Sequence, residues 1–264
     1  MTALPPYTPF LQRGFIRFLH RFFRKNFNGV RIARDGIPEV PVDRPVVVIS
    51  NHPSWWDPIT LLLMGELMFP GRRCYGPIDA EALTKYPILG RLGLLPLDSE
   101  SPSSIRAFMR SAEAIFADNQ ALGMTVQGEF VDSRSRPLKL QAGIAHLMRR
   151  FPDVPVVPVA LEYPFWNERR PEALIRFGEV DLGGPHRRSS RPAELLEHAT
   201  GMLTDTMDCL SELAQTRDPA QFETLIDGRR GVGGSYDLLR RLKAWSQGRS
   251  FDPSHEARPG GSPQ

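Results

Sequence analysis

The sequence has few cysteines and no long apolar run, and both absences narrow what the protein can be. Its 264 residues include only Cys74 and Cys209, which lie far apart and form no CxxC pair. A disulfide framework is therefore not expected, and a reducing compartment fits. No stretch approaches the roughly 18 apolar residues of a membrane-spanning helix, and arginines interrupt the first apolar segment, which argues against a signal peptide.

Acidic residues are missing from the first 34 positions, although the formal net charge of the whole chain is only +3. The basic residues of this segment are Arg13, Arg17, Arg21, Arg24, Lys25, Arg31 and Arg34, and the first acid is Asp35. A basic end of this kind predicts an anionic partner, which could be phospholipid, nucleic acid or an acidic carrier protein.

Residues 9–27 predict an amphipathic helix with phenylalanines on one half and basic side chains on the other. One interpretation places this helix in a membrane interface, with Phe15, Phe18, Phe22 and Phe23 entering the acyl boundary. The alternative is an ordinary helix that packs on the core and exposes a solvated basic face. The alternation of phenylalanine with arginine, together with the lack of a known nucleic-acid module, argues against a nucleic-acid partner.

The remaining pattern interleaves short β-branched runs with amphipathic stretches, which predicts an α/β sandwich of helices around a mostly parallel or mixed central sheet. We expect an N-terminal basic helix over 1–28, a globular catalytic domain over 29–227, and a linker, short helix and loose tail over 228–264. Strands are predicted at 45–50, 72–78, 93–98, 123–128, 154–163 and 173–182, with longer helices near 103–119, 140–151 and 192–215.

The stretch NHPSWWDP, residues 51–58, carries the clearest chemical signal. It follows a predicted strand and opens a predicted helix, with Asp57 as the expected N-cap and Pro58 at the first helical position. A carboxylate on one imidazole nitrogen of His52 would leave the other nitrogen free to take a proton. The alternative is a structural histidine next to a helix cap. Trp55 and Trp56 fit either the core or a membrane interface.

This stretch resembles the HxxxxD motif of the glycerolipid acyltransferase family, which includes 1-acylglycerol-3-phosphate acyltransferases. Three later segments resemble further family blocks in the right order, namely ALTKYPILGRLGLLPLD, VQGEFVDSRSRPLKLQAGIAHLM and VPVVPVALEY. The resemblance runs from about residue 30 to 182. It implies that His52 acts as general base on an acceptor hydroxyl or amine and that Asp57 orients it. It also implies acyl-CoA or acyl-carrier protein as cosubstrate, with no metal or other cofactor.

The third block departs from the family pattern of Pro-Glu-Gly-Thr-Arg, which helps to hold the glycerol phosphate of the acceptor. Here Gln127, Gly128, Glu129 and Phe130 occupy the positions of its last four residues. Glu129 would repel a phosphate, which prefers charge-assisted donors. We therefore expect an acceptor other than lysophosphatidate, such as a glycosylated lipid, a lysolipid with another head group or an amino-acid lipid. The candidate acceptor-binding residues are Gln127, Gly128, Glu129, Arg134, Arg136 and Lys139.

Two other functions remain open at this point. The chain could be a lipid-binding relative that has lost catalysis, or a hydrolase that passes the acyl group of a thioester to water. In each case the expected location is cytoplasmic and peripheral to the inner face of a membrane.

Overall fold

The protein is described by a computed structural model that covers residues 4–34, 39–41 and 43–228. The linker, short helix and tail predicted for 228–264 lie outside the described residues, except for Gly228. None of the helices in the described part is long and apolar enough to cross a membrane.

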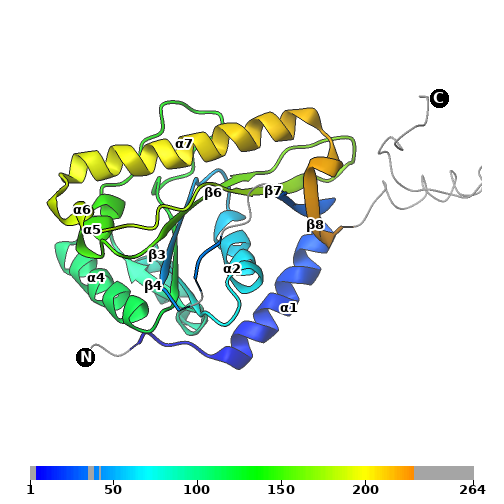
Figure 1. Ribbon diagram of the computed structural model, residues 1–264. Coiled ribbons are helices and arrows are strands. Elements are labelled where there is room, and N and C mark those ends of the chain that lie inside the picture. Colours follow the sequence, from blue (N-terminus) through cyan, green and yellow to red (C-terminus); the bar gives the residue numbers. More distant parts are fainter. Residues whose placement is uncertain (1–3, 35–38, 42, 229–264) are drawn as a thin grey trace, which may run out of the picture.

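An eight-stranded sheet forms the centre of the fold, in the order β4-β3-β5-β2-β6-β7-β1-β8 (Figure 1). Its neighbours are parallel except at two pairs, β6 with β7 and β1 with β8. The predicted α/β sandwich around a mostly parallel sheet is therefore confirmed. The strands are β1 (Gly29–Ala33), β2 (Val46–Ser50), β3 (Cys74–Asp79), β4 (Leu94–Leu97), β5 (Ala121–Thr125), β6 (Val156–Glu162), β7 (Glu172–Phe177) and β8 (Phe222–Asp227).

Helices cover both faces of the sheet, and each face has its own apolar cluster. One cluster joins the sheet to α1 (Pro9–Asn26) and α2 (Asp57–Met68), and the other joins it to α4 (Pro102–Ala117), α5 (Gly143–Arg150) and α7 (Pro192–Thr216). Successive residues of a strand face opposite sides, so Val159 and Leu161 of β6 belong to the first cluster and Ala160 to the second. The shorter helices are α3 (Ala80–Lys85) and α6 (His186–Ser189), with 3-10 turns at Pro87–Arg91 and Pro219–Gln221.

Two strands were not predicted, and two predicted strands end early. β1 and β8 pair with each other at one side of the sheet, where their polar residues hide the strand pattern. The strand expected at 123–128 ends at Thr125, because the chain turns at Gly128 with a φ of 76°. The strand expected at 173–182 ends at Phe177, although Asp181 still forms an isolated bridge with Val156.

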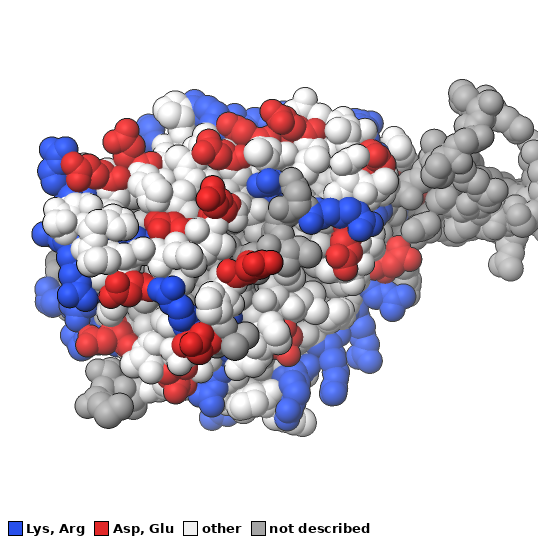
Figure 2. Space-filling model, in the orientation of Figure 1, with Lys and Arg blue, Asp and Glu red and all other residues white. Residues whose placement is uncertain are grey.

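The N-terminal helix packs on the sheet with only part of its apolar half. Ile16, Leu19 and Phe23 are buried in the cluster shared with α2. Phe23 is fully buried, so its assignment as a membrane-contacting residue is wrong: the side chain packs into the core against Trp56 and Phe27. The basic side chains of the helix lie along one edge of the molecule (Figure 2).

Candidate active site

The turn between β2 and α2 is fastened to the neighbouring strands on both sides. The side chain of Asn51 pairs with the backbone of Leu161 in β6, donating to its carbonyl at 2.9 Å and accepting from its N–H at 2.8 Å. On the other side, the backbone N–H of His52 donates to Oε1 of Gln127 at 2.7 Å. These contacts fix the point at which the chain leaves the sheet and hold the next residues in one conformation.

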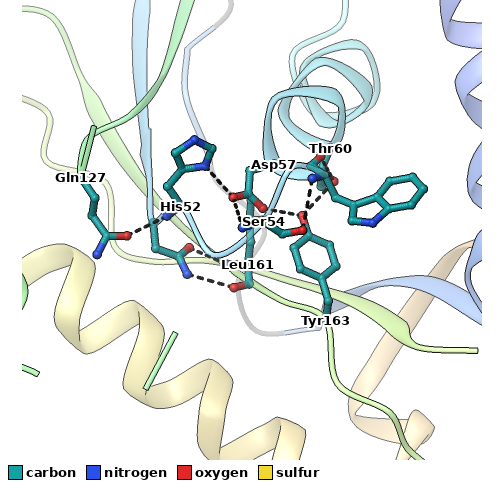
Figure 3. Close-up of polar contacts among 9 residues, drawn as sticks. His52, Ser54, Asp57, Thr60, Gln127, Leu161 and Tyr163 are labelled. Carbon is teal, nitrogen blue, oxygen red and sulfur yellow. Dashed lines mark hydrogen bonds and ion pairs between the residues drawn. The ribbon is translucent and has the colours of Figure 1, made fainter. Parts of the chain in front are cut away.

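His52 and Asp57 form the contact predicted from their spacing. Nδ1 of His52 lies 2.7 Å from Oδ2 of Asp57, whose side chain is fully buried. The second ring nitrogen of His52 points away from this contact (Figure 3). The His52 side chain keeps 15% of its surface exposed. A carboxylate that accepts the Nδ1 proton leaves Nε2 as the proton acceptor.

The Asp57 carboxylate has two further donors that sequence reasoning missed. The backbone N–H of Ser54 donates to Oδ2 at 2.8 Å, and the hydroxyl of Tyr163 donates to Oδ1 at 2.7 Å (Figure 3). Burial, followed by the negative charge of Asp57, raises the pKa of Tyr163 well above its usual range, so this hydroxyl keeps its proton and remains a donor. Together with the His52 contact, these two hydrogen bonds hold the carboxylate in a fixed orientation.

The expected role of Asp57 as a helix N-cap is wrong. The helix begins at Asp57 itself and its cap position is Trp56, without a side-chain cap. The carboxylate instead turns back toward the histidine and toward Tyr163 at the end of β6. The strand predicted at 154–163 ends at this tyrosine. That position at a strand end is the only feature of the sequence that could have indicated its contact with Asp57.

The divergent third block lies directly beside the histidine. The backbone N–H of Val131 donates to the carbonyl of His52 at 2.9 Å, and the exposed ring of Phe130 lies 4.5 Å from the imidazole, centre to centre. Gln127 is buried and positions the backbone of His52. It is not accessible to an acceptor, so its prediction as an acceptor-binding residue is wrong. Gly128 forms the turn, and Glu129 is exposed.

Both arginines among the candidate acceptor-binding residues already have acidic partners. Arg134 donates two hydrogen bonds to Asp132, at 2.9 and 2.7 Å. Arg136 pairs with Asp208 of α7. Lys139 is exposed on the same loop. A bound phosphate would therefore compete with internal carboxylates for both guanidinium groups.

Two hollows lie near the turn of residues 52–57. A cavity of about 60 Å³ lies between α2 and the sheet, and its lining is apolar, with Leu62, Phe69 and Gly123 among it. A groove of about 960 Å³ lies between the residues after His52, the loop at 132–134, the end of β6 and the end of α7. His52 itself is part of neither lining, although Pro53 and Ser54 line the groove and Pro58 lines the cavity.

A row of neighbouring aromatic rings connects α1 to the turn of residues 52–57. Ring centres lie 5.9 Å apart for Phe15 and Phe18, 5.4 Å for Phe18 and Phe22, and 5.1 Å for Phe22 and Trp56. Trp55 follows at 5.7 Å from Trp56 and is 63% exposed. The row therefore begins on the helix surface and ends at Trp55, two residues before Asp57.

Within the described residues, no group of three or more His, Cys, Asp or Glu side chains is placed to hold a metal ion. The Acyltransferase family model matches residues 31–162, which is half of the 264-residue chain. The match runs from β1 to the end of β6 and includes the turn with His52 and Asp57. A search of curated proteins finds no match.

Proposed function

Because the chain belongs to the acyltransferase family, we propose that it moves a fatty acyl group from a thioester donor to a hydroxyl of a membrane lipid. The observation that carries this proposal is the contact of 2.7 Å between Nδ1 of His52 and a buried, triply hydrogen-bonded carboxylate. This contact orients the ring and stabilises the imidazolium that forms when Nε2 takes a proton.

In the proposed reaction, Nε2 of His52 removes the proton of the acceptor hydroxyl as its oxygen attacks the thioester carbonyl. The new C–O ester bond forms, the C–S bond breaks, and the proton passes from the imidazolium to the leaving thiolate. General-base catalysis of this kind contributes roughly 10² to 10⁴-fold. The donor is acyl-CoA or acyl-carrier protein, and no other cofactor is required.

The apolar cavity beside α2 supports a place for the start of the acyl chain. Its lining combines large apolar side chains with glycines of β3 and β5, where small residues leave room. At Gly76 an added Cβ would come within 2.9 Å of the carbonyl oxygen of Gly123, so glycine also allows the two strands to approach. The cavity lies between α2 and the sheet, with a lining that reaches from Leu94 of β4 to Phe177 of β7, and the groove then remains for the acceptor.

The aromatic row and the basic face of α1 support binding of the protein to a membrane that contains anionic lipids. Phe10 and Phe18 are 75% and 51% exposed, and Arg13, Arg17 and Arg21 lie on the same helix without an acidic neighbour there. Exposed aromatic rings favour the lipid interface, and each basic residue near an anionic surface contributes about 1 kcal/mol. The membrane residues in this proposal are Phe15, Phe18 and Phe22, with Trp55.

The test is acyl transfer in vitro, with labelled acyl-CoA, a lipid extract and detection of products by mass spectrometry. Wild-type protein should form a labelled lipid and the His52→Ala variant should not. A lipid-binding relative without catalysis would form no product with either protein. Thioester hydrolysis at the same rate with and without lipid would show a hydrolase and overturn the proposal.

A further inference from the structure

The polar groove beside the catalytic turn has an unusual balance of charge for a lipid head-group site. Its lining contains two carboxylates, Asp132 and Glu162, and two guanidinium groups, Arg134 and Arg217. The formal charges cancel, and Arg134 is already held by Asp132 through two hydrogen bonds. A phosphate dianion would gain few free donors here and would meet two negative side chains.

Glu162 is a partly buried carboxyl group that lines this groove. It is the last residue of β6 and lies on the face of α7, where the Ser211 hydroxyl donates to it. Burial raises its pKa, while the Ser211 hydroxyl and the charges of Arg136 and Arg134 act in the opposite direction. Titratable groups with a shifted pKa that line a hollow are often functional. A partly buried carboxylate of this kind selects hydrogen-bond donors.

An exposed aromatic ring and one side-chain amide also line the groove. Phe165 is 63% exposed at its rim, and an exposed flat ring can pack against the C–H face of a sugar. Gln215 of α7 adds a side chain that both donates and accepts. Sugar hydroxyl groups, which both donate and accept hydrogen bonds, match a lining that contains donors and acceptors and carries no net formal charge.

We propose that this groove binds the uncharged sugar head group of a glycolipid, whose hydroxyl is the acyl acceptor. This inference rests on the proposed acyl transfer and names its acceptor class. The groove suits it in position as well, because Pro53 and Ser54, the residues directly after the histidine, form part of its wall. A sugar in the groove would then lie beside the turn that carries His52.

The first experiment compares acceptors at equal acyl-CoA concentration: dodecyl glucoside, lysophosphatidate and dodecanol. We expect kcat/KM to be at least tenfold higher for the glucoside than for either of the others. The Glu162→Gln variant should reduce the ratio of glucoside to dodecanol transfer about tenfold, as for the loss of one charged hydrogen bond. Glu113→Gln, which removes an exposed carboxylate paired with Arg150 on the far helices, is the matched control and should leave that ratio unchanged.

The second experiment reads the groove without catalysis. Binding of hexyl glucoside to the His52→Ala protein is measured by calorimetry, and the Glu162→Gln substitution in that background should weaken it about tenfold. No transfer to any acceptor would overturn the proposed function, whereas this binding would still report on the groove. Equal or faster transfer to lysophosphatidate, or no glucoside binding, would overturn the sugar assignment alone.

Discussion

The substitution Asp57→Asn tests the catalytic geometry most sharply, because the structure predicts which way the new amide turns. Oδ2 of Asp57 accepts from Ser54 N–H and faces Nδ1 of His52, while Oδ1 accepts from the hydroxyl of Tyr163. A backbone N–H cannot turn into an acceptor, but a hydroxyl can. The amide oxygen should therefore take the Oδ2 position, and the amide nitrogen should donate to Tyr163.

The tyrosine can accept this reversal because it has a second partner. Its hydroxyl lies 3.1 Å from Oγ1 of Thr60, which donates to the carbonyl of Trp56 and can accept from Tyr163. The asparagine of the variant would then keep His52 in its productive tautomer, and only the negative charge would be lost. The lost stabilisation of the imidazolium is about 1.5–3 kcal/mol for a charged hydrogen bond, which corresponds to about 10–150-fold in kcat/KM.

Steady-state transfer from acyl-CoA measures this loss, with Asp57→Ala as the comparison. Alanine leaves the N–H of Ser54 and the hydroxyl of Tyr163 without their acceptor and frees the imidazole, so its activity should fall close to that of His52→Ala. An asparagine variant as inactive as His52→Ala would mean that the amide fixes the wrong tautomer, a fault that costs about 10⁴-fold in a serine protease triad. An asparagine variant as active as wild type would remove the carboxylate from the mechanism.

Three further changes test the lipid contacts and the groove. Phe18→Ser removes a half-exposed ring and should weaken binding to anionic vesicles about fivefold, for a loss of about 1 kcal/mol. Phe23→Ala, at a buried position, should instead lower the free energy of unfolding by about 3–5 kcal/mol. Unchanged vesicle binding by Phe18→Ser would contradict the proposed membrane surface. Gly123→Ala adds a Cβ that meets nothing closer than 3.9 Å and should shift transfer toward shorter acyl chains, unlike Gly201→Ala on α7; an unchanged chain-length profile contradicts the cavity assignment. Burial raises the pKa of Glu162 above the ordinary 4.5, so the stability this carboxyl contributes is present below pH 4.5 and is lost as the pH rises through its folded pKa. Glu162→Gln should therefore melt above wild type at pH 7 and together with it near pH 4, and a lower melting temperature at pH 7 would contradict this reasoning.

Local patterns in the sequence were enough to predict most of the central elements. The helix expected at 9–27 is observed at Pro9–Asn26, and the strand expected at 45–50 is observed at Val46–Ser50. Both are set by nearby residues: an amphipathic period in one and a β-branched run in the other. The contact between His52 and Asp57 was predictable for the same reason, since one turn brings residues five apart together.

The parts that could not be predicted depend on partners far away in the chain. β1 contains Arg31 in its middle, which reads as exposed, but its guanidinium is buried and bonds Glu172 at 2.9 Å, 141 residues later. Gln127 reads as an acceptor ligand, but its side chain holds a backbone group 75 residues away. Tyr163 lies 106 residues from the carboxylate that it orients. No local pattern specifies such pairs, because the sheet order that joins them is set by the whole fold.

Aromatic contacts of the same long range join the proposed membrane surface to the surroundings of Asp57. The ring of Trp56 packs against those of Phe22 and Phe27, and Asp57 is the next residue in the chain. Phe27 in turn lies 5.7 Å from the ring of Tyr163, which donates to that carboxylate. Phe22, a residue of the proposed membrane surface, is thus joined through Trp56 and Phe27 to Tyr163, the donor to Asp57. In the proposed function, a lipid acceptor would therefore meet the turn of residues 52–57 at the membrane surface, because Trp55 belongs both to that turn and to that surface.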